Sequence, residues 1–231
     1  MSKVVIETFD SRDAAYDAAA EAVAEALRAG LRTKGYASLA GAGGSTPAPV
    51  YERLSAMPLA WDQVTAALVD ERFVPNTAPD SNEKLLREHL LKDQAAKARF
   101  TPMYSDGAPS EAAAVASKTH AKLLPLDAVL LGMGEDGHFA SLFPDNPALE
   151  EGLDLSSRKV VIAAPAGEPA PPQTRLTFTL AALAQSRSLV LLVTGAAKKA
   201  VVEAALDDPA RYPIGAVFAQ TKAPVRVLWA A

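Results

Sequence analysis

The segment LDAVLLGMGEDGHFASLFPDN, residues 126–146, holds the pattern on which the fold prediction depends. It begins with a short apolar run of the kind that forms buried strands. Three glycines follow within six residues, and glycine allows both positive φ angles and the close approach of another molecule to the main chain. The turn then delivers Asp136 and His138, so a buried strand places a carboxylate and an imidazole at its carboxyl end.

Similar apolar runs alternate with helical segments along the rest of the chain. Strands are expected at 4–9, 36–40, 63–69, 100–103, 126–131, 160–164, 175–179, 189–193 and 225–229, and helices at 14–27, 47–55, 80–91, 110–123, 180–186 and 196–206. This alternation, with strands that lack a polar face, predicts a doubly wound, mostly parallel sheet with helices on both faces, a Rossmann-like three-layer α/β/α fold. The length of 231 residues suits a single domain spanning 1–231.

Local signals set the expected ends of the helices and the positions of two histidines. The first, alanine-rich helix is expected to end near Gly30, and Asp80 with Glu83 makes a capping box for the third helix. His89 and His120 fall in expected helices among charged neighbours, which indicates surface positions for both.

The composition argues against several classes of protein. The formal net charge is -4 and there is no dense basic run, which argues against a nucleic-acid surface. The absence of cysteine excludes disulfides and thiolate chemistry. Residues 1–10 lack an apolar signal core and no apolar run is long enough to span a membrane, so we expect a cytoplasmic protein without a membrane partner. Histidines and carboxylates show no metal-ligand spacing, and we expect neither a metal nor a cofactor.

Four glycine-rich or polar segments follow directly after expected strands, at Gly41, Asp70, Gly132 and Thr194. In parallel sheets, ligands bind outside the carboxyl ends of the strands, which all lie at one edge. We therefore expect these four segments to meet and to form a single site.

The segment GAGGSTP, residues 41–47, is typical of a phosphate-binding turn. Gly43, Gly44, Ser45 and Thr46 offer main-chain amides and two hydroxyls at the start of a helix whose dipole favours an anion. No lysine follows the glycines, so the segment is not the nucleotide-binding P-loop. A tight strand-to-helix turn without a ligand explains the segment equally well.

Charged and polar residues near other strand ends also have two interpretations. Asp70, Glu71 and Arg72 form either a solvated turn or part of the site, and their position after a buried strand favours the site. Asn82 suits a helix start, with a polar substrate contact as a second role. Lys198 lies in the first turn of a helix whose dipole it opposes, so it either meets a bound anion or lies in solvent.

His138 is the best candidate for proton transfer, since histidine both takes and gives protons near neutral pH. Asp136 is the candidate carboxylate that would fix the tautomer of His138 and stabilise its imidazolium form. The two residues are two positions apart, so a direct hydrogen bond depends on the conformation of the turn. Ser141 does not lie in a G-x-S-x-G segment, which disfavours a serine nucleophile.

Together these segments resemble the 6-phosphogluconolactonases, a branch of the glucosamine-6-phosphate isomerase/6-phosphogluconolactonase family. The resemblance is carried by GAGGSTP (41–47), DERFVPNTAPDSN (70–82), GMGEDGHFASLFPDN (132–146), TRLTFTLAAL (174–183) and TGAAK (194–198), which stand in the family's order. The deaminase branch shares the glycine loop and GEDGH, but it continues with an Asn-Glu-Pro stretch where this chain has Ala-Ser-Leu-Phe-Pro.

The resemblance implies hydrolysis of 6-phospho-D-glucono-1,5-lactone to 6-phospho-D-gluconate in the oxidative pentose phosphate pathway, without a metal or an organic cofactor. His138 would be the general base and acid, and Arg72 would hold and polarise the substrate near the reacting carbon. The phosphate would be bound by polar and basic side chains, namely Ser45, Thr46, Arg175 and Lys198. The ligand would be a phosphorylated sugar lactone, and the protein would be a monomer or a weak homodimer.

The chain departs from the family pattern at a few positions, and two other functions stay open. Asp145 stands where the family has glycine, and alanines occupy 170, 181 and 184 in place of lysine, proline and asparagine. The alternatives are a glucosamine-6-phosphate deaminase/isomerase, which would release ammonia, and a non-catalytic sugar-phosphate sensor, which would bind without hydrolysis. Ala-Ser-Leu-Phe-Pro argues against the first alternative, and an intact His138 argues against the second.

Overall fold

The centre of the structure, a computed structural model that describes residues 4–167, 172–220 and 222–231, is a parallel sheet. Its strands follow the order β1-β10-β9-β6-β2-β3-β5. Their bounds are β1 Val4–Phe9, β2 Ala37–Gly41, β3 Val64–Leu68, β5 Arg99–Phe100, β6 Ala128–Leu131, β9 Leu189–Thr194 and β10 Val225–Ala230. The chain moves outward from β2 to β3 and β5 and then returns to β6 on the other side of β2. The order of the strands therefore reverses between β2 and β6, which creates a crevice at their carboxyl ends.

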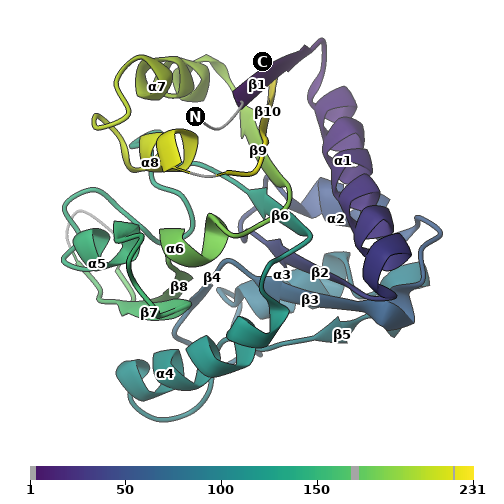
Figure 1. The fold of residues 1–231 in the computed structure, drawn as a ribbon, viewed down its shortest axis with the longest axis horizontal. Coiled ribbons are helices and arrows are strands. Elements are labelled where there is room, and N and C mark those ends of the chain that lie inside the picture. The colour runs from purple at the N-terminus through teal and green to yellow at the C-terminus, as the bar shows by residue number, and fades with distance from the viewer. Residues whose placement is uncertain (1–3, 168–171, 221) are drawn as a thin grey trace.

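Helices cover both faces of this sheet, which confirms the predicted three-layer, doubly wound fold. They are α1 Arg12–Lys34, α2 Ala48–Ser55, α3 Asn82–His89, α4 Pro109–His120, α5 Leu149–Leu153, α6 Leu180–Leu183, α7 Ala196–Asp207 and α8 Pro213–Gln220. Figure 1 shows α1 and α2 on one side of the sheet, and α7 and α8 on the other. The short helices α5 and α8 were not predicted. Of the strand expected at 100–103, only Phe100 belongs to a strand, because β5 spans Arg99–Phe100.

Helix α1 is longer than predicted, because Gly30, the glycine expected to end it, packs inside the helix instead. Ser11 caps the start of the helix, because its Oγ accepts a hydrogen bond of 3.1 Å from the Ala14 amide. Gly30 is buried inside the helix, and a Cβ at this position would lie 2.7 Å from Cγ of Asp127. The helix ends at Gly35, which has a φ of 77°. The prediction that it ends near Gly30 is therefore wrong: Gly30 allows the close approach of a carboxyl, and Gly35 terminates the helix.

A second, antiparallel sheet of three strands was not predicted. Its order is β4-β8-β7, with β4 at Asp70–Arg72, β8 at Arg175–Phe178 and β7 at Val161–Ala164. The chain leaves β3 and enters β4 after one residue, Val69, whose carbonyl accepts a bond of 2.8 Å from the Phe178 amide. The charged triplet at 70–72 is thus a strand and not a turn.

Two further expectations from the sequence are wrong at the level of side chains. The N-cap of α3 is Ser81, whose Oγ accepts from the Lys84 amide at 3.2 Å, and Asp80 does not cap this helix. His120 is fully buried, because its side of α4 packs on the second sheet. Its ring meets the ring of Phe178 edge-on at a centroid distance of 5.4 Å.

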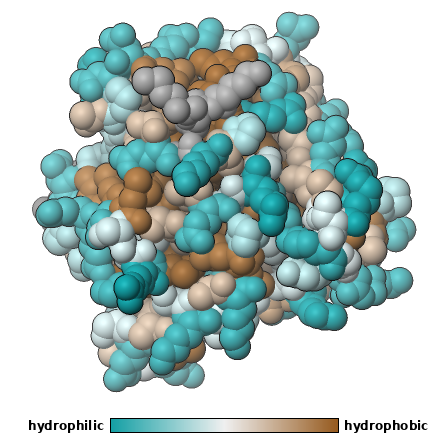
Figure 2. Space-filling view, in the orientation of Figure 1, coloured by the Kyte–Doolittle hydropathy of each residue, from teal (hydrophilic) through white to brown (hydrophobic). Residues whose placement is uncertain are grey.

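The surface that Figure 2 shows is mainly hydrophilic, and its hydrophobic residues appear mostly in the spaces between elements. One such space is an apolar groove of about 490 Å³ beside α5 and α8, lined in part by Leu149, Leu153, Pro209, Tyr212 and Ala216. None of the helices in the described ranges is both long and apolar enough to cross a membrane.

Candidate active site

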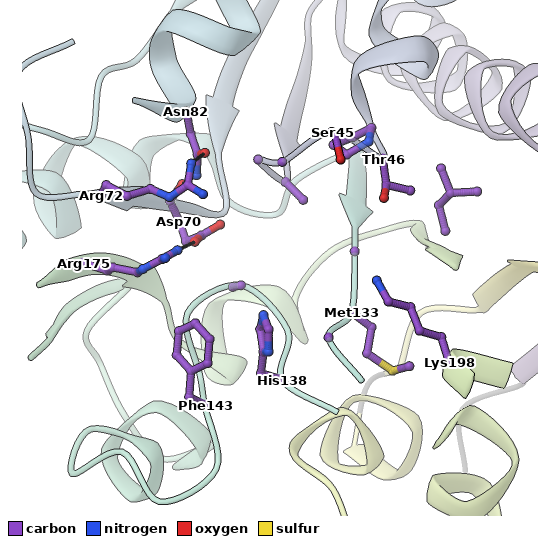
Figure 3. A pocket seen from close by; sticks show the side chains of 18 residues that line it. Ser45, Thr46, Asp70, Arg72, Asn82, Met133, His138, Phe143, Arg175 and Lys198 are labelled. Atoms are coloured by element: carbon purple, nitrogen blue, oxygen red, sulfur yellow. Dashed lines mark hydrogen bonds and ion pairs between the residues drawn. The ribbon is translucent and has the colours of Figure 1, made fainter. Parts of the chain in front are cut away.

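A pocket of about 330 Å³ lies at the carboxyl ends of β2 and β6, in the crevice where the strand order reverses. The segments that follow β2, β3, β6 and β9 all contribute to it, as the positions of the motifs predicted. The lining includes every proposed site residue except Asp136: Gly43, Gly44, Ser45, Thr46, Asp70, Arg72, Asn82, His138, Arg175 and Lys198. Figure 3 shows how the labelled side chains surround the pocket.

The loop after β2 is held in a conformation that only glycine allows at two positions. Gly44 has a φ of 91°, and a Cβ on Gly43 would overlap the side-chain amide of Asn82. The buried hydroxyl of Tyr51 donates a hydrogen bond of 2.6 Å to the Ala42 carbonyl, and burial raises the pKa of this phenol. Ser45 therefore follows a rigid turn and lies just before the N-cap of α2, Pro47, where the helix dipole favours an anion.

Asp136 and His138 form a direct hydrogen bond, which the sequence left open. Oδ1 of Asp136 lies 2.6 Å from Nδ1 of His138 and also accepts from the His138 amide at 3.1 Å. Burial raises the pKa of the Asp136 carboxyl, but the hydrogen bond and charge of His138 outweigh it and hold the pKa below its usual value. A carboxylate at Nδ1 places the proton of the neutral ring there and leaves Nε2 as an acceptor.

The glycines of the turn make this pair possible. A Cβ on Gly134 would overlap both the imidazole of His138 and the carboxyl of Asp136. The amide of Gly134 donates to the His138 carbonyl at 3.0 Å, and Gly137 has a φ of 78°. The close approach of ring, carboxylate and backbone therefore requires the GEDGH spacing.

Asn82 connects α3 to the charged strand β4. Its side-chain amide donates to the Asp70 carbonyl at 2.8 Å, and its Oδ1 accepts from Nη1 of Arg72. The same Nη1 of Arg72 donates to the Asp80 carbonyl at 3.0 Å. Asn82 thus has a structural role that the sequence did not predict, because it orients Arg72 at the wall of the pocket.

The buried carboxylate of Glu71 fixes this region from behind. It accepts bonds of 2.7 Å from the amides of Arg72, Asn82 and Glu83, and one of 3.0 Å from Ser81 Oγ. A carboxylate at the first turn of α3 satisfies amides that no helical carbonyl can reach. Glu71 therefore anchors the backbone of Arg72 and Asn82, which both line the pocket.

Asp70 joins the second sheet to the loop that carries His138. Its Oδ2 accepts a bond of 2.6 Å from Ser141 Oγ and lies 3.7 Å from Nη1 of Arg175. The Ser141 amide donates to Oγ1 of Thr177 at 3.1 Å, so the amide and the hydroxyl of Ser141 are both bound to this sheet. Ser141 is fully buried and binds Asp70, a role that its sequence context does not indicate.

Lys198 faces the pocket from the first turn of α7. The neighbouring Lys199 instead lies 4.3 Å from the ring of Trp229 and 3.8 Å from the Glu203 carboxylate. Lys198 belongs to no ion pair with any residue in the described ranges, and Figure 3 shows it on the same side of the pocket as Ser45 and Thr46. A cation at a helix N-terminus with no carboxylate partner is suited to binding an anion.

Phe143 is one of the pocket residues that the sequence did not indicate, and the one with contacts to two proposed site residues. Its ring lies 4.2 Å from the His138 ring between centroids, tilted by 34°, and 5.4 Å from the guanidinium carbon of Arg175. Phe143 belongs to Ala-Ser-Leu-Phe-Pro, the segment that the sequence comparison used only to distinguish the lactonase branch from the deaminase branch. That segment supplies both Ser141 and Phe143, and each of them contacts a polar group of the pocket.

The comparisons with known proteins agree with this geometry. Residues 10–229 match the family model described as glucosamine-6-phosphate isomerases/6-phosphogluconolactonase. The chain belongs to this family. It is 49% identical to the 6-phosphogluconolactonase of Caulobacter vibrioides over 98% of this chain and 97% of that protein. It is 46% identical to the Rhizobium meliloti 6-phosphogluconolactonase over 87% of this chain and 88% of the relative.

Solved structures of the family have the same fold. The crystal structure of a 6-phosphogluconolactonase from Shewanella baltica superposes with a TM-score of 0.93 at 36% identity and covers 99% of this chain and 98% of its own. The 6-phosphogluconolactonase of Trypanosoma brucei gives a TM-score of 0.85 at 30% identity, over 100% and 97% of the two chains. A monomeric glucosamine-6-phosphate deaminase gives 0.80 at 20% identity over 100% and 97%, which shows the shared fold alone.

The departures from the family pattern at positions that the structure describes leave the pocket intact. Asp145, in place of the expected glycine, has a φ of 60°, a left-handed conformation that glycine adopts without steric cost. Asp tolerates this conformation better than most residues. Ala181 and Ala184 lie in and directly after α6, and Ala170 lies outside the described residues. Within the described ranges, no three His, Cys, Asp or Glu side chains are placed to hold a metal ion.

Proposed function

We propose that this protein hydrolyses 6-phospho-D-glucono-1,5-lactone to 6-phospho-D-gluconate. The observation that carries the proposal is the 2.6 Å hydrogen bond that Asp136 accepts from His138, beside a pocket that Arg72 and Lys198 also line. The 49% identity to a 6-phosphogluconolactonase supports it. The corresponding setting is the oxidative pentose phosphate pathway in the cytoplasm.

His138 acts first as a general base and then as a general acid. Its Nε2 takes a proton from water, and the water oxygen forms a bond to C1 of the lactone. The carbonyl oxygen becomes an oxyanion, to which Arg72 donates a hydrogen bond. The oxyanion then collapses, the bond from C1 to the ring oxygen breaks, and protonated His138 gives its proton to that oxygen. The new carboxylic acid loses its own proton to solvent.

Asp136 supports both steps through Nδ1. Its carboxylate keeps the proton of the neutral imidazole on Nδ1, so Nε2 is the basic nitrogen. It also stabilises the imidazolium that forms after proton transfer. Asp136 accepts a hydrogen bond from the imidazole and does not touch the lactone.

The phosphate binds on the side of the pocket where Ser45, Thr46 and Lys198 lie. These contacts are remote from the reacting carbon, and their binding energy orients the lactone for attack. The deaminase alternative is disfavoured, because Ser141 and Phe143 occupy the segment in which that branch carries its acidic residue.

The test is a coupled assay that generates the lactone in place and follows the release of acid. The uncatalysed rate must be subtracted, because the lactone also hydrolyses without an enzyme. General base catalysis contributes about 10²–10⁴-fold, so His138→Ala lowers kcat on that scale and leaves binding of 6-phosphogluconate nearly unchanged. Wild-type turnover in His138→Ala contradicts the mechanism. Ammonia release from glucosamine 6-phosphate, without acid release from the lactone, contradicts the function.

A further inference from the structure

The turn that carries His138 is in contact with a segment from near the other end of the chain, residues 208–214. A Cβ on Gly137 would lie 2.6 Å from Cβ and 2.8 Å from Cδ1 of Tyr212, so the glycine backbone lies directly against this side chain. The amide of Ile214 donates a hydrogen bond of 3.0 Å to the Gly137 carbonyl. The segments that carry the family resemblance end at Lys198, so they assign no role to residues 208–214.

The peptide group between Gly137 and His138 is held at both of its polar ends. Its carbonyl accepts from Ile214, and its N–H, the amide of His138, donates to Oδ1 of Asp136 at 3.1 Å. The same Oδ1 lies 2.6 Å from Nδ1 of the His138 ring. A rotation of this peptide group would therefore break both backbone bonds and displace the ring from the carboxylate oxygen.

Gly137 makes a support from outside the turn necessary. It has a φ of 78°, a conformation that glycine adopts without steric cost but that nothing in a glycine residue enforces. Within the turn, its amide donates to the Gly134 carbonyl at 3.1 Å, which fixes only the N-terminal side of the residue. The carbonyl side is fixed by residues 208–214, so the orientation of His138 depends on them.

The segment that supports the turn is itself rigid. The Arg211 amide donates to the Asp208 carbonyl at 3.1 Å. Gly215 packs so closely on Pro209 that a Cβ on it would lie 2.2 Å from the Pro209 carbonyl oxygen. Ile214 is fully buried in the first turn of α8, and its amide is one of those that no helical carbonyl can reach. A fixed donor is therefore available to the catalytic turn.

We propose that Tyr212 is a positioning residue for His138, with the Ile214 amide as its backbone counterpart. Tyr212 limits the movement of Gly137 from one side, and Ile214 fixes the Gly137 carbonyl. Together they keep the ring of His138 at the carboxylate of Asp136, so that Nδ1 carries the proton and Nε2 is free to accept one. Neither Tyr212 nor Ile214 lines the pocket, so both act through the turn and not on the substrate. This inference rests on the proposed role of His138.

The contact uses the base of the Tyr212 side chain and not its hydroxyl. The three atoms nearest to a Cβ on Gly137 are Cβ, Cδ1 and Cγ of Tyr212. The Arg211 guanidinium lies 5.5 Å from the centre of the same ring, and Tyr212 also lines the apolar groove beside α8. Phenylalanine at this position therefore keeps the support, whereas alanine removes the ring and leaves only Cβ.

The kinetics of three variants give the first measurement. Tyr212→Ala should lower kcat for the lactone by about 10- to 100-fold and change KM by less than about threefold, because it misplaces the base but keeps the pocket lining. Tyr212→Phe should restore kcat to within about threefold of the wild type. Tyr16→Ala is the matched control on α1, because Tyr16 is also half-buried and its ring also has an arginine, Arg53, at 5.5 Å. This control should keep the wild-type kcat and KM.

Nitrogen NMR of the histidine rings locates the proton directly and does not require turnover. The protein is labelled at its three histidines and measured at about pH 9, where imidazoles are neutral, and His138→Ala assigns the signals. In the wild type, Tyr212→Phe and Tyr16→Ala, the His138 proton should lie on Nδ1, as the bond to Asp136 requires. In Tyr212→Ala the ratio of Nδ1–H to Nε2–H should fall by about tenfold or more, because a bond to a charged acceptor is lost. A variant that is only less stable keeps the wild-type ratio.

A second variant covers a failure to fold. If Tyr212→Ala does not fold, as judged by circular dichroism, Tyr212→Met replaces it. Methionine keeps most of the apolar volume but is flexible, so it should still lower kcat and the proton ratio more than phenylalanine does.

The outcomes distinguish the positioning role from the proposed function. An unchanged proton ratio in the Tyr212 variant overturns the positioning role, whatever happens to kcat and even if the protein hydrolyses the lactone. A reduced ratio that phenylalanine restores supports it. Absence of lactone hydrolysis in the wild type, with the ratio still reduced in the variant, would refute the proposed function alone.

Discussion

Ser141 Oγ donates a hydrogen bond of 2.6 Å to Asp70 Oδ2, and this buried bond joins the His138 loop to the second sheet. Ser141→Ala removes the donor and leaves a buried carboxylate oxygen without it. A hydrogen bond to a charged group contributes about 1.5–3 kcal/mol, so urea unfolding should show a loss of that size. The kcat should also fall, because the loop positions His138.

Ser156 offers a matched control for this prediction. Its Oγ also donates to an aspartate, Asp154, at 2.7 Å, but both residues are exposed. Ser156→Ala should change the free energy of unfolding by no more than about 0.5 kcal/mol and leave kcat unchanged. Equal effects of the two substitutions would show that burial does not increase the contribution of the Ser141–Asp70 bond to the free energy of unfolding or to kcat.

Asp145 adopts a left-handed conformation, with a φ of 60°, at an exposed position. Glycine reaches this conformation without steric cost, whereas alanine pays about 1–2 kcal/mol and Asp less than alanine. Thermal unfolding should therefore rank Asp145→Gly at or above the wild type, and Asp145→Ala below both. A higher midpoint for the alanine variant than for the glycine variant would contradict the backbone explanation.

The parallel sheet and its site were predictable because the signals lie within single segments. The run at 126–131 is apolar without alternation, and the glycines directly after it determine where Asp136 and His138 stand. Position at the carboxyl end of a parallel strand then follows from the fold class. Contacts between segments were not predictable in this way. Phe143 contacts Arg175, which lies in β8, and no local pattern reveals that β8 pairs with β4 beside the pocket.

The errors have physical reasons of the same kind. Strand β4 consists of charged residues, and it is extended because β8, far away in the sequence, pairs with it. His120 has charged neighbours along α4, but its own side of the helix faces Phe178. Glycine is common at helix ends, but Gly30 lies inside α1 and allows the close approach of Asp127. In each case tertiary packing decides what the local sequence leaves ambiguous.

Buried His120 should make the protein less stable in mild acid. Burial lowers the pKa of its imidazole, against the effect of the 2.7 Å bond from Nδ1 to the Ala116 carbonyl. Below about pH 6.5 the unfolded chain takes up a proton that the folded protein excludes, so stability falls as the pH falls through this range. Between pH 7.5 and 5.5 the loss is about 1.4 kcal/mol if the folded pKa lies below this window.

The measurement is urea unfolding at both pH values with His120→Gln, which keeps a side-chain donor for Ala116. This variant should lose most of the pH dependence that His120 causes, whatever its absolute stability. An unchanged difference between the two pH values in His120→Gln would refute the role of His120.

Gly134 and Gly132 allow a test of the Asp136–His138 pair that leaves both of its members in place. A Cβ on Gly134 would overlap the pair, whereas a Cβ on Gly132 would have no atom within 4 Å. Gly134→Ala should therefore separate ring and carboxylate and lower kcat by about 10²–10⁴-fold, as the loss of the base does. Gly132→Ala adds the same methyl group to the same turn and should keep a kcat within about tenfold of the wild type. The coupled lactone assay compares the two variants, with circular dichroism as the check on folding. Similar kcat values for both would mean that turnover does not depend on the bond between Asp136 and His138.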